Sequence, residues 1–184
     1  MKKMIILIGV IVILIGGLIT WQSIKSKNSV LAPAKTSSQQ VVPVKNNPIS
    51  NTSEQPGLVI KASAEDNTDP QTKQAIGDRL QITLQNTSAQ PMTNIEVFYS
   101  MKDKKTGQVE SYYQKLSGLI LTPHESRTVA FDNEKGAGHY PENKYSLYRS
   151  SQNEVDFTIE VSTPGFKPVT STTLKSAGTG ETGG

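Results

Sequence analysis

The chain of 184 residues contains no cysteine, two histidines and a single tryptophan. The absence of cysteine excludes disulfide bonds, thiol chemistry, a lipidated cysteine anchor and zinc sites built from thiolates. Small extracellular domains of eukaryotes commonly carry disulfides. A domain without them is typical of a bacterial or archaeal surface protein whose core is large enough to be stable alone.

The motifs of several common chemistries are also missing. The sequence has no nucleophile elbow, no HExxH, no CxxC and no glycine-rich phosphate loop. A Ser/His/Asp combination can be drawn from Ser117 or Ser126 with His124 and Asp132, but no catalytic frame surrounds these residues. The sequence therefore predicts a protein that is not an enzyme and that uses no cofactor.

Charge is absent from a long apolar run near the N-terminus. Residues 4–21 read MIILIGVIVILIGGLITW, without a charged residue or a proline. About 20 apolar helical residues span the hydrocarbon core of a bilayer, so residues 1–21 are predicted to form a transmembrane signal anchor. The alternative is a signal peptide that is cleaved near Ala34. A buried helix of a soluble domain is disfavoured because the run has no polar face.

The flanks of this run bear on its orientation. Lysines lie on both sides, so the positive-inside rule gives almost no bias. The N-terminus is expected in the cytoplasm because everything that can fold follows the run. Trp21 suits the interfacial region, and glycines in the run would let a second helix approach closely. The residues assigned to the anchor are Lys2, Lys3, Gly9, Gly16, Gly17 and Trp21.

Basic residues are concentrated towards the N-terminus. Six of the 19 Lys and Arg precede residue 57, together with a single acidic residue. Residues 57–175 are nearly neutral, which disfavours a nucleic-acid-binding face, whereas the basic flanks suit anionic lipid headgroups. Residues 22–56 are polar and contain several prolines, which predicts a flexible extracellular stalk. The glycine-rich residues 176–184 are predicted to be a disordered tail.

Apolar and polar residues alternate over much of the region 57–175, which is typical of β-strands. The run 155–162 is the clearest case, because apolar residues occupy every second position and polar residues lie between them. About seven or eight short strands separated by Asn, Pro and Gly turns predict an all-β fold, an antiparallel β-sandwich. The other predicted strands are 58–63, 79–85, 95–101, 109–116, 125–131, 169–174 and, more weakly, 145–149.

Two stretches of this region also resemble a known class of domain. Residues 80–100, LQITLQNTSAQPMTNIEVFYS, contain a strand that ends in Asn-Thr, a loop with proline and a second strand of the form apolar-x-Val-x-Tyr. Residues 121–132, LTPHESRTVAFD, contain Leu-x-Pro-x-x-Ser-x-x-Val. Both resemble immunoglobulin-like domains of prokaryotic surface proteins. The resemblance implies an immunoglobulin-like sandwich over residues 57–175 and a surface location, and it implies little about activity.

A long loop between predicted strands is the candidate contact surface. It begins at Gly136 and contains His139 and Tyr140, with Tyr145 and Tyr148 shortly after. Long loops that interrupt regular strands are often functional. Tyrosine suits binding because its body is rigid and apolar and its tip is polar. The alternative is that Tyr145 and Tyr148 pack at the edge of the sandwich.

An acidic loop is a candidate calcium site. Glu65, Asp66 and Asp69 gather carboxylate oxygens of the kind that Ca²⁺ prefers, although the EF-hand pattern is absent. A solvated turn is the alternative reading of this loop.

The two histidines offer a second candidate metal site. His124 and His139 could act as a pair, with a carboxylate as a further ligand. The carboxylates considered for this role are those of Asp132, Glu134 and Glu142. Surface histidines without a metal are the alternative.

Together these features predict a membrane-anchored, extracytoplasmic binding or adhesion module without enzymatic activity. Its expected partners are membrane lipid and a protein or glycan of the cell envelope. The alternative is a structural or accessory subunit of an envelope, pilus-like or secretion assembly. A homo-oligomer that forms through the helix or the strand edges is compatible with either function.

Overall fold

The computed structural model describes residues 41–65, 69–72 and 76–178. The predicted anchor (residues 1–21), the stalk residues 22–40 and most of the predicted tail lie outside this part of the chain. Asp66 of the acidic loop also lies outside it. Within the described residues, no helix combines the length and the apolar character that a membrane span needs.

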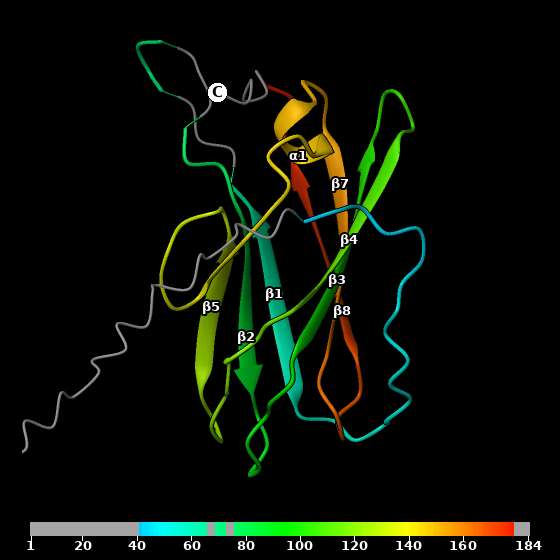
Figure 1. The fold of residues 1–184 in the computed structure, drawn as a ribbon, viewed down its shortest axis with the longest axis vertical. Coiled ribbons are helices and arrows are strands. Elements are labelled where there is room, and N and C mark those ends of the chain that lie inside the picture. The colour runs from blue at the N-terminus through cyan, green and yellow to red at the C-terminus, as the bar shows by residue number, and fades with distance from the viewer. Residues whose placement is uncertain (1–40, 66–68, 73–75, 179–184) are drawn as a thin grey trace, which may run out of the picture. The chain divides into compact units, whose positions relative to one another are not determined.

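The described residues form a β-sandwich of two sheets with four strands each (Figure 1). One sheet has the strand order β1-β2-β5-β6, and the other has the order β4-β3-β7-β8. Seven of the eight strands fall on ranges that alternation predicts, so the predicted all-β sandwich is confirmed. The strands are β1 (Leu58–Ala64), β2 (Leu80–Asn86), β3 (Glu96–Asp103), β4 (Val109–Lys115), β5 (Ser126–Phe131), β6 (His139–Tyr140), β7 (Val155–Ser162) and β8 (Val169–Lys175).

Alternation along the strands decides which side chains enter the core. In β7 the apolar residues at 155, 157, 159 and 161 are at most 1% exposed, and the residues between them are polar. Tyr99 of β3 stacks on Tyr112 of β4 with 5.4 Å between ring centroids, and it lies 5.5 Å from Phe131 of β5. These rings therefore join the two sheets, and burial of each contributes roughly 1.5–3 kcal/mol.

Two short elements differ from the predictions. Residues 145–149 are not a strand, because Leu147–Ser150 form one helical turn, α1. Consecutive residues Leu147 and Tyr148 are both buried there, which the alternation of a half-buried strand does not allow. The two-residue strand β6 is too short to show a period, and it pairs with β5 in parallel, so the sandwich is not wholly antiparallel.

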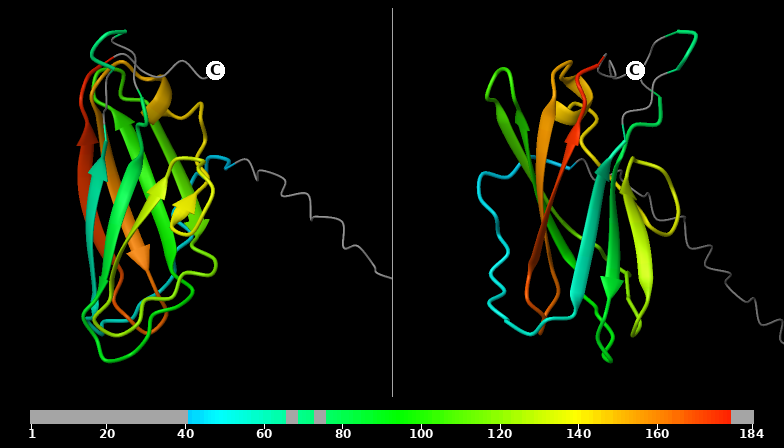
Figure 2. Two further views of the ribbon diagram at one scale, coloured as in Figure 1. Left: turned by 90° about the vertical axis from the view of Figure 1, so that its left-hand side faces the viewer. Right: turned by 180° about the vertical axis from the view of Figure 1, so that it is seen from behind.

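Residues 41–56, called the strap below, also differ from the predicted stalk. Val44 donates its N–H to the carbonyl of Ser111 on β4, with 2.8 Å between the atoms. Asn47 bonds to Glu160 on the outer face of β7, and Asn51 donates to three acceptors at the end of β7 and in the turn that follows. The segment therefore lies along the sandwich (Figure 2). Composition predicts disorder because few apolar residues are present, but hydrogen bonds fix these polar residues in place.

Asp103, a residue that is 3% exposed, closes the β3–β4 hairpin. It accepts hydrogen bonds from the Ser151 hydroxyl at 2.6 Å and from the Asn153 amide at 2.9 Å. It also accepts from the backbone N–H groups of Thr106 and Lys105, at 2.8 and 2.9 Å. These donors hold the pKa of Asp103 well below its usual range, with Ser151 making the largest contribution.

This depressed pKa gives the first prediction, which concerns acid stability. A carboxyl whose pKa is lower in the folded state stabilises the fold fully above its unfolded pKa of about 3.9, and this stabilisation is lost as pH falls towards the folded pKa. Asp103→Asn should therefore lower the urea midpoint at pH 7, and the difference from the parent should shrink below about pH 4. Urea titrations from pH 7 to pH 2.5 measure this. A difference that stays constant with pH would contradict the assignment.

Candidate functional site

The connection between β5 and β6 carries the candidate site. β6 lies beside the end of β5 in the sheet, with His139 next to Ala130 and Tyr140 next to Phe131. Ala130 donates its N–H to the carbonyl of Gly138 at 2.8 Å, so hydrogen bonds close the loop between the strands at its base. Figure 2 shows this loop on the side of the sandwich that β5 borders.

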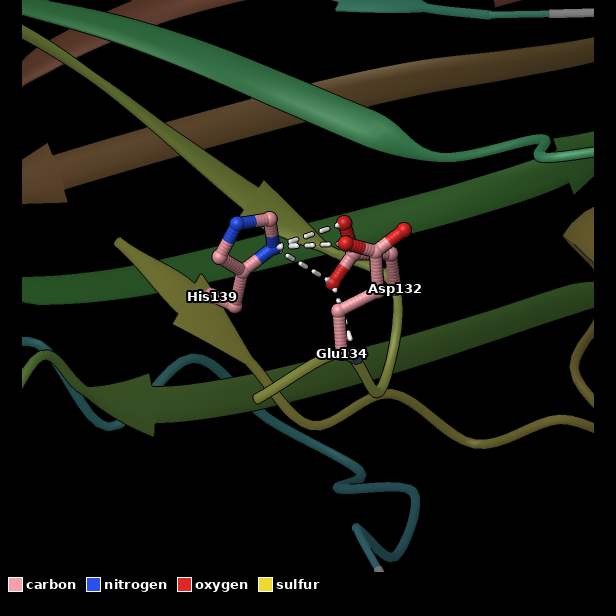
Figure 3. Close-up of side chains that lie close together, drawn as sticks. All are labelled: Asp132, Glu134 and His139. Atoms are coloured by element: carbon pink, nitrogen blue, oxygen red, sulfur yellow. Dashed lines mark hydrogen bonds and ion pairs between the residues drawn. The ribbon is translucent and has the colours of Figure 1, made fainter. Parts of the chain in front are cut away.

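His139 faces two carboxylates of this loop (Figure 3). Its Nδ1 atom lies 2.9 Å from Oδ2 and 3.1 Å from Oδ1 of Asp132, and 3.7 Å from Oε2 of Glu134. The Asp132 side chain is 5% exposed, whereas that of Glu134 is 60% exposed. Asn133, between the two carboxylates, has a positive φ of 62°. That turn lets both carboxylates point towards the histidine.

Arg79, which precedes β2, extends this cluster across the sheet. Its Nε donates to Glu65 at 2.8 Å, and its Nη1 lies 3.8 Å from Asp132 and 3.9 Å from Glu134. The hydrogen bond to Glu65 makes the largest contribution to raising the pKa of the guanidinium. Arg79 therefore links the end of β1 to the β5–β6 loop.

Tyr140 is the next residue after His139 and lies on a different surface, because successive strand residues point to opposite faces. Its ring lies 5.9 Å from that of Phe131, and burial raises the pKa of its hydroxyl. Tyr140 and Pro141 line an open groove of about 510 Å³ together with the strap and the end of β4. The Gln114 amide donates to the Pro141 carbonyl at 2.7 Å, so the groove bridges the edges of the two sheets.

The edge strand β4 runs along this groove. In an antiparallel pair, alternate residues direct both backbone groups away from their partner strand. The Ser111 carbonyl accepts from Val44 of the strap, so the odd-numbered residues of β4 face outward. The N–H groups of Tyr113 and Lys115 consequently point away from β3, and within the described residues neither has a backbone partner. The groove thus combines partly exposed apolar side chains with strand-edge N–H groups that have no backbone partner among the described residues.

The two remaining tyrosines of the predicted contact surface do not join His139 and Tyr140. Tyr145 is 61% exposed, and Lys144 lies over its ring at 5.2 Å. Tyr148 is 2% exposed and meets Phe157 edge-on at 5.4 Å, and its hydroxyl donates to the carbonyl of Glu65. Tyr148 therefore belongs to the core, Tyr145 is exposed, and His139 and Tyr140 lie on different surfaces, so the four residues of the predicted contact surface do not form one patch.

The acidic loop shows different uses for its residues. Glu65 forms an ion pair with Arg79. The Asp69 carboxylate accepts hydrogen bonds from the backbone N–H groups of Gln71 and Thr72, at 2.8 and 2.7 Å. These turn contacts lower the pKa of Asp69, with Thr72 making the largest contribution. Among the described residues, Glu65 and Asp69 are in no group of three metal-ligating side chains. Asp69 therefore stabilises a turn, and the calcium site, which includes Asp66 outside the described residues, stays a prediction.

The two histidines lie at opposite ends of β5. His124 precedes the strand and His139 pairs with its next-to-last residue, Ala130. Six strand residues at about 3.3 Å each separate the two ends by roughly 20 Å, so the histidines do not form a metal pair. The same separation applies to Asp132 and His124, which excludes the Ser/His/Asp combination. Of the carboxylates considered beside His139, Asp132 and Glu134 lie next to it, whereas Glu142 pairs with Arg149.

The sequence analysis did not predict that the strap contacts β4 or that Arg79 belongs to this region. The strap approaches β4 across more than 60 positions of sequence, and no local pattern reports such a contact. The apolar residues Val41, Val42 and Val44 were a usable signal, since they are the apolar cluster of an otherwise polar segment. They line the groove with Tyr140.

Comparisons with known proteins identify similar solved structures but no protein family. No protein-family model and no curated protein sequence matches the chain. The putative ApaA protein from Bordetella pertussis matches with a TM-score of 0.41 and 13% identity, over 67% of this chain and 96% of that one. The structural genomics target SoR45 matches with a TM-score of 0.36 and 10% identity, over 65% of this chain and 84% of that one.

A third similar structure is a β-glucosidase involved in saponin metabolism from intestinal bacteria. It has a TM-score of 0.35 and 17% identity, and the match covers 65% of this chain but 16% of the enzyme. None of the three TM-scores reaches 0.5. No activity is transferred from these proteins to this chain.

Proposed function

We propose that this protein is a membrane-anchored, extracytoplasmic binding module without enzymatic activity. Its immunoglobulin-like sandwich binds an extended segment of a partner protein of the cell envelope. The segment lies in the groove between Tyr140 and the strap and pairs with the edge of β4. Addition of a strand to an exposed sheet edge is a general mode of peptide recognition, in which backbone bonds supply affinity and side-chain pockets supply specificity.

The observation that carries this proposal is the outward-facing edge of β4 beside an apolar groove. Edge strands with free backbone groups are normally blocked by charges, bulges or covering segments. Here the strap covers the edge at Ser111 and leaves Tyr113 and Lys115 open within the described residues. Val42 beside them is 64% exposed. A bound strand would continue the pairing that Val44 begins.

Strand order supports the immunoglobulin-like assignment within this proposal. The order β1-β2-β5 in one sheet and β4-β3-β7-β8 in the other places consecutive strands β2 and β3 in different sheets, as Greek-key sandwiches do. The predicted anchor adds a location. Residues 1–21, if they form a transmembrane anchor, hold the sandwich at a membrane.

The test is site-specific photo-cross-linking in membranes of the cells that produce the protein. A photoreactive residue at position 42 of the full-length chain should give an adduct with one envelope protein. Lys115→Pro should reduce the adduct about tenfold, because proline removes the outward N–H without touching the bonds to β3. The matched control is Val109→Pro, which removes an outward N–H on the same edge at the far end from the groove.

The possible outcomes separate the alternatives. An adduct that Lys115→Pro abolishes and Val109→Pro retains supports strand addition. An adduct of this chain with itself would instead favour the homo-oligomeric assembly subunit. Equal cross-linking in the two proline variants, or no adduct at position 42, would refute the proposed groove.

A further inference from the structure

We propose that Asp132, Glu134 and His139 form a binding site for a divalent first-row transition-metal ion such as Zn²⁺ or Mn²⁺. One imidazole nitrogen and two carboxylates are the donors that such ions accept in proteins. This assignment is independent of the groove, because His139 and Tyr140 serve different surfaces.

The spacing of the donors suits a small ion. One ligand atom from each of the three residues lies within 4.8 Å of the others. Two ligands bound at about 2.1 Å in tetrahedral geometry lie about 3.4 Å apart. The His139 Nδ1 atom lies 2.9 Å from Asp132 and 3.7 Å from Glu134, so each of these two distances is within about 0.5 Å of that value. Figure 3 shows the three side chains converging.

The site is built on the fold and is not a chance surface encounter. The Asp132 N–H donates to the Tyr140 carbonyl at 3.2 Å, which holds the end of β5 against β6. The Glu134 N–H donates to Oδ1 of Asp132 at 3.0 Å, which orients the buried carboxylate. Hydrogen-bonded carboxylates of this kind have a fixed direction, and such orientation strengthens metal binding.

The charge around the site also favours a cation. Three carboxylates, those of Glu65, Asp132 and Glu134, surround Arg79 and His139. Within the described part of the chain, the ion pairs of these carboxylates go to Arg79 and His139 alone. With a neutral imidazole the group carries an excess of about two negative charges, which a divalent ion would balance.

The site is also accessible from outside. Glu134 and His139 are 60% and 28% exposed, and an open depression of about 240 Å³ borders His139 and Arg79. Three protein ligands leave coordination positions that water can fill. A bound ion would cross-link the two ends of the β5–β6 loop and stiffen it.

Metal titration of the purified full-length protein in detergent tests the proposal. After removal of metals with a chelator, calorimetry with Zn²⁺ should show one ion per chain. Glu134→Gln and His139→Ala should each weaken binding about tenfold or more. The matched control is His124→Ala, which removes the other histidine and should leave the affinity unchanged.

A second readout distinguishes ligation from a structural effect. Co²⁺ added to the parent protein should give visible d–d absorption bands that are lost in His139→Ala, while circular dichroism shows that the fold is retained. Glu134 is exposed, so Glu134→Gln should fold normally and test ligation by itself. Zn²⁺ binding by Glu134→Gln and His139→Ala that is as tight as binding by the parent protein would overturn the site, and so would an equally large loss of affinity in His124→Ala. Absence of any binding would also overturn it.

Discussion

Replacement of Arg149 by methionine is expected to lower the free energy of unfolding by about 3–5 kcal/mol. Arg149 in α1 donates from Nε to Oε1 of Glu142 at 2.8 Å, and its Nη2 makes a second contact with the same oxygen. The two side chains are 8% and 4% exposed. Removal of the guanidinium takes this partner from the buried Glu142 carboxylate, and breaking a buried ion pair by removing one member is strongly destabilising.

The ion pair matters because it anchors the segment that carries the candidate site. Glu142 lies two residues after the end of β6, and Arg149 lies in α1, the helical turn at one end of the sandwich (Figure 1). The Arg149 guanidinium also lies 5.3 Å from the centre of the Tyr148 ring. Loss of the pair should therefore loosen the Tyr140 wall of the groove before the whole domain unfolds.

Urea unfolding of three variants checks the expectation. Arg149→Met and Glu142→Met should each be strongly destabilising, and the double variant should cost clearly less than their sum, because the two side chains contact each other directly and the loss of that contact is counted only once. Additive effects, or a single-variant cost below about 1 kcal/mol, would contradict a buried ion pair of this importance. Arg127→Met is the matched control, because its pair with Glu125 is exposed and should contribute less than about 1 kcal/mol.

Most of the strands could be predicted because apolar and polar residues alternate with a period of two along a strand that has one buried face. The run 155–162 places each apolar side chain on one face, and the structure buries that face against the other sheet. The same rule failed for residues 145–149, where Tyr145 and Leu147 are two positions apart by chance. Their neighbour Tyr148 is buried as well, and a helical turn accommodates adjacent buried residues where a strand does not.

The strap and the candidate site show why the remainder could not be predicted. The composition of a segment indicates how much apolar area it can bury. Residues 41–56 contain few apolar residues, so their composition predicts a disordered segment. They order because amide side chains such as that of Asn51 satisfy carbonyls at strand ends. His139 was a sequence candidate, but its relation to Asp132 and Arg79 depends on β2, β5 and β6 lying in one sheet. Strand order of this kind follows from the whole fold.

Asn86 belongs to the sequence stretch that resembles immunoglobulin-like domains, and the structure shows which contacts its side chain makes. It ends β2 in the stretch that resembles immunoglobulin-like domains, and it is fully buried. Its amide Nδ2 donates to the carbonyls of Gln90, Leu121 and Thr122 at 2.7, 3.1 and 3.1 Å. Its Oδ1 accepts from both the N–H and the hydroxyl of Ser88. One side chain thus fastens the β2–β3 loop to the connection between β4 and β5.

Asn86→Ala is therefore expected to destabilise the domain by about 3 kcal/mol or more. Each buried polar group that loses its partner costs about 1–3 kcal/mol, and this substitution affects several of them. The urea midpoint should fall accordingly, with an unchanged m-value if folding stays two-state. Asn51→Ala is the matched control. Asn51 makes a similar set of amide bonds, but it lies partly exposed in the strap, so its loss should cost about 1 kcal/mol.

Asn86→Asp separates the donor role of the side chain from its size. The aspartate keeps the acceptor oxygen for Ser88 but turns a second oxygen, in place of the amide donor, towards three carbonyls. At pH 7 this variant should be at least as unstable as Asn86→Ala, because a buried carboxylate would face acceptors. Lower pH should recover part of the loss, since a protonated carboxyl can donate one hydrogen bond. A stable Asn86→Asp variant at pH 7 would show that the shape of the side chain, and not its donated hydrogen bonds, holds this end of the sandwich.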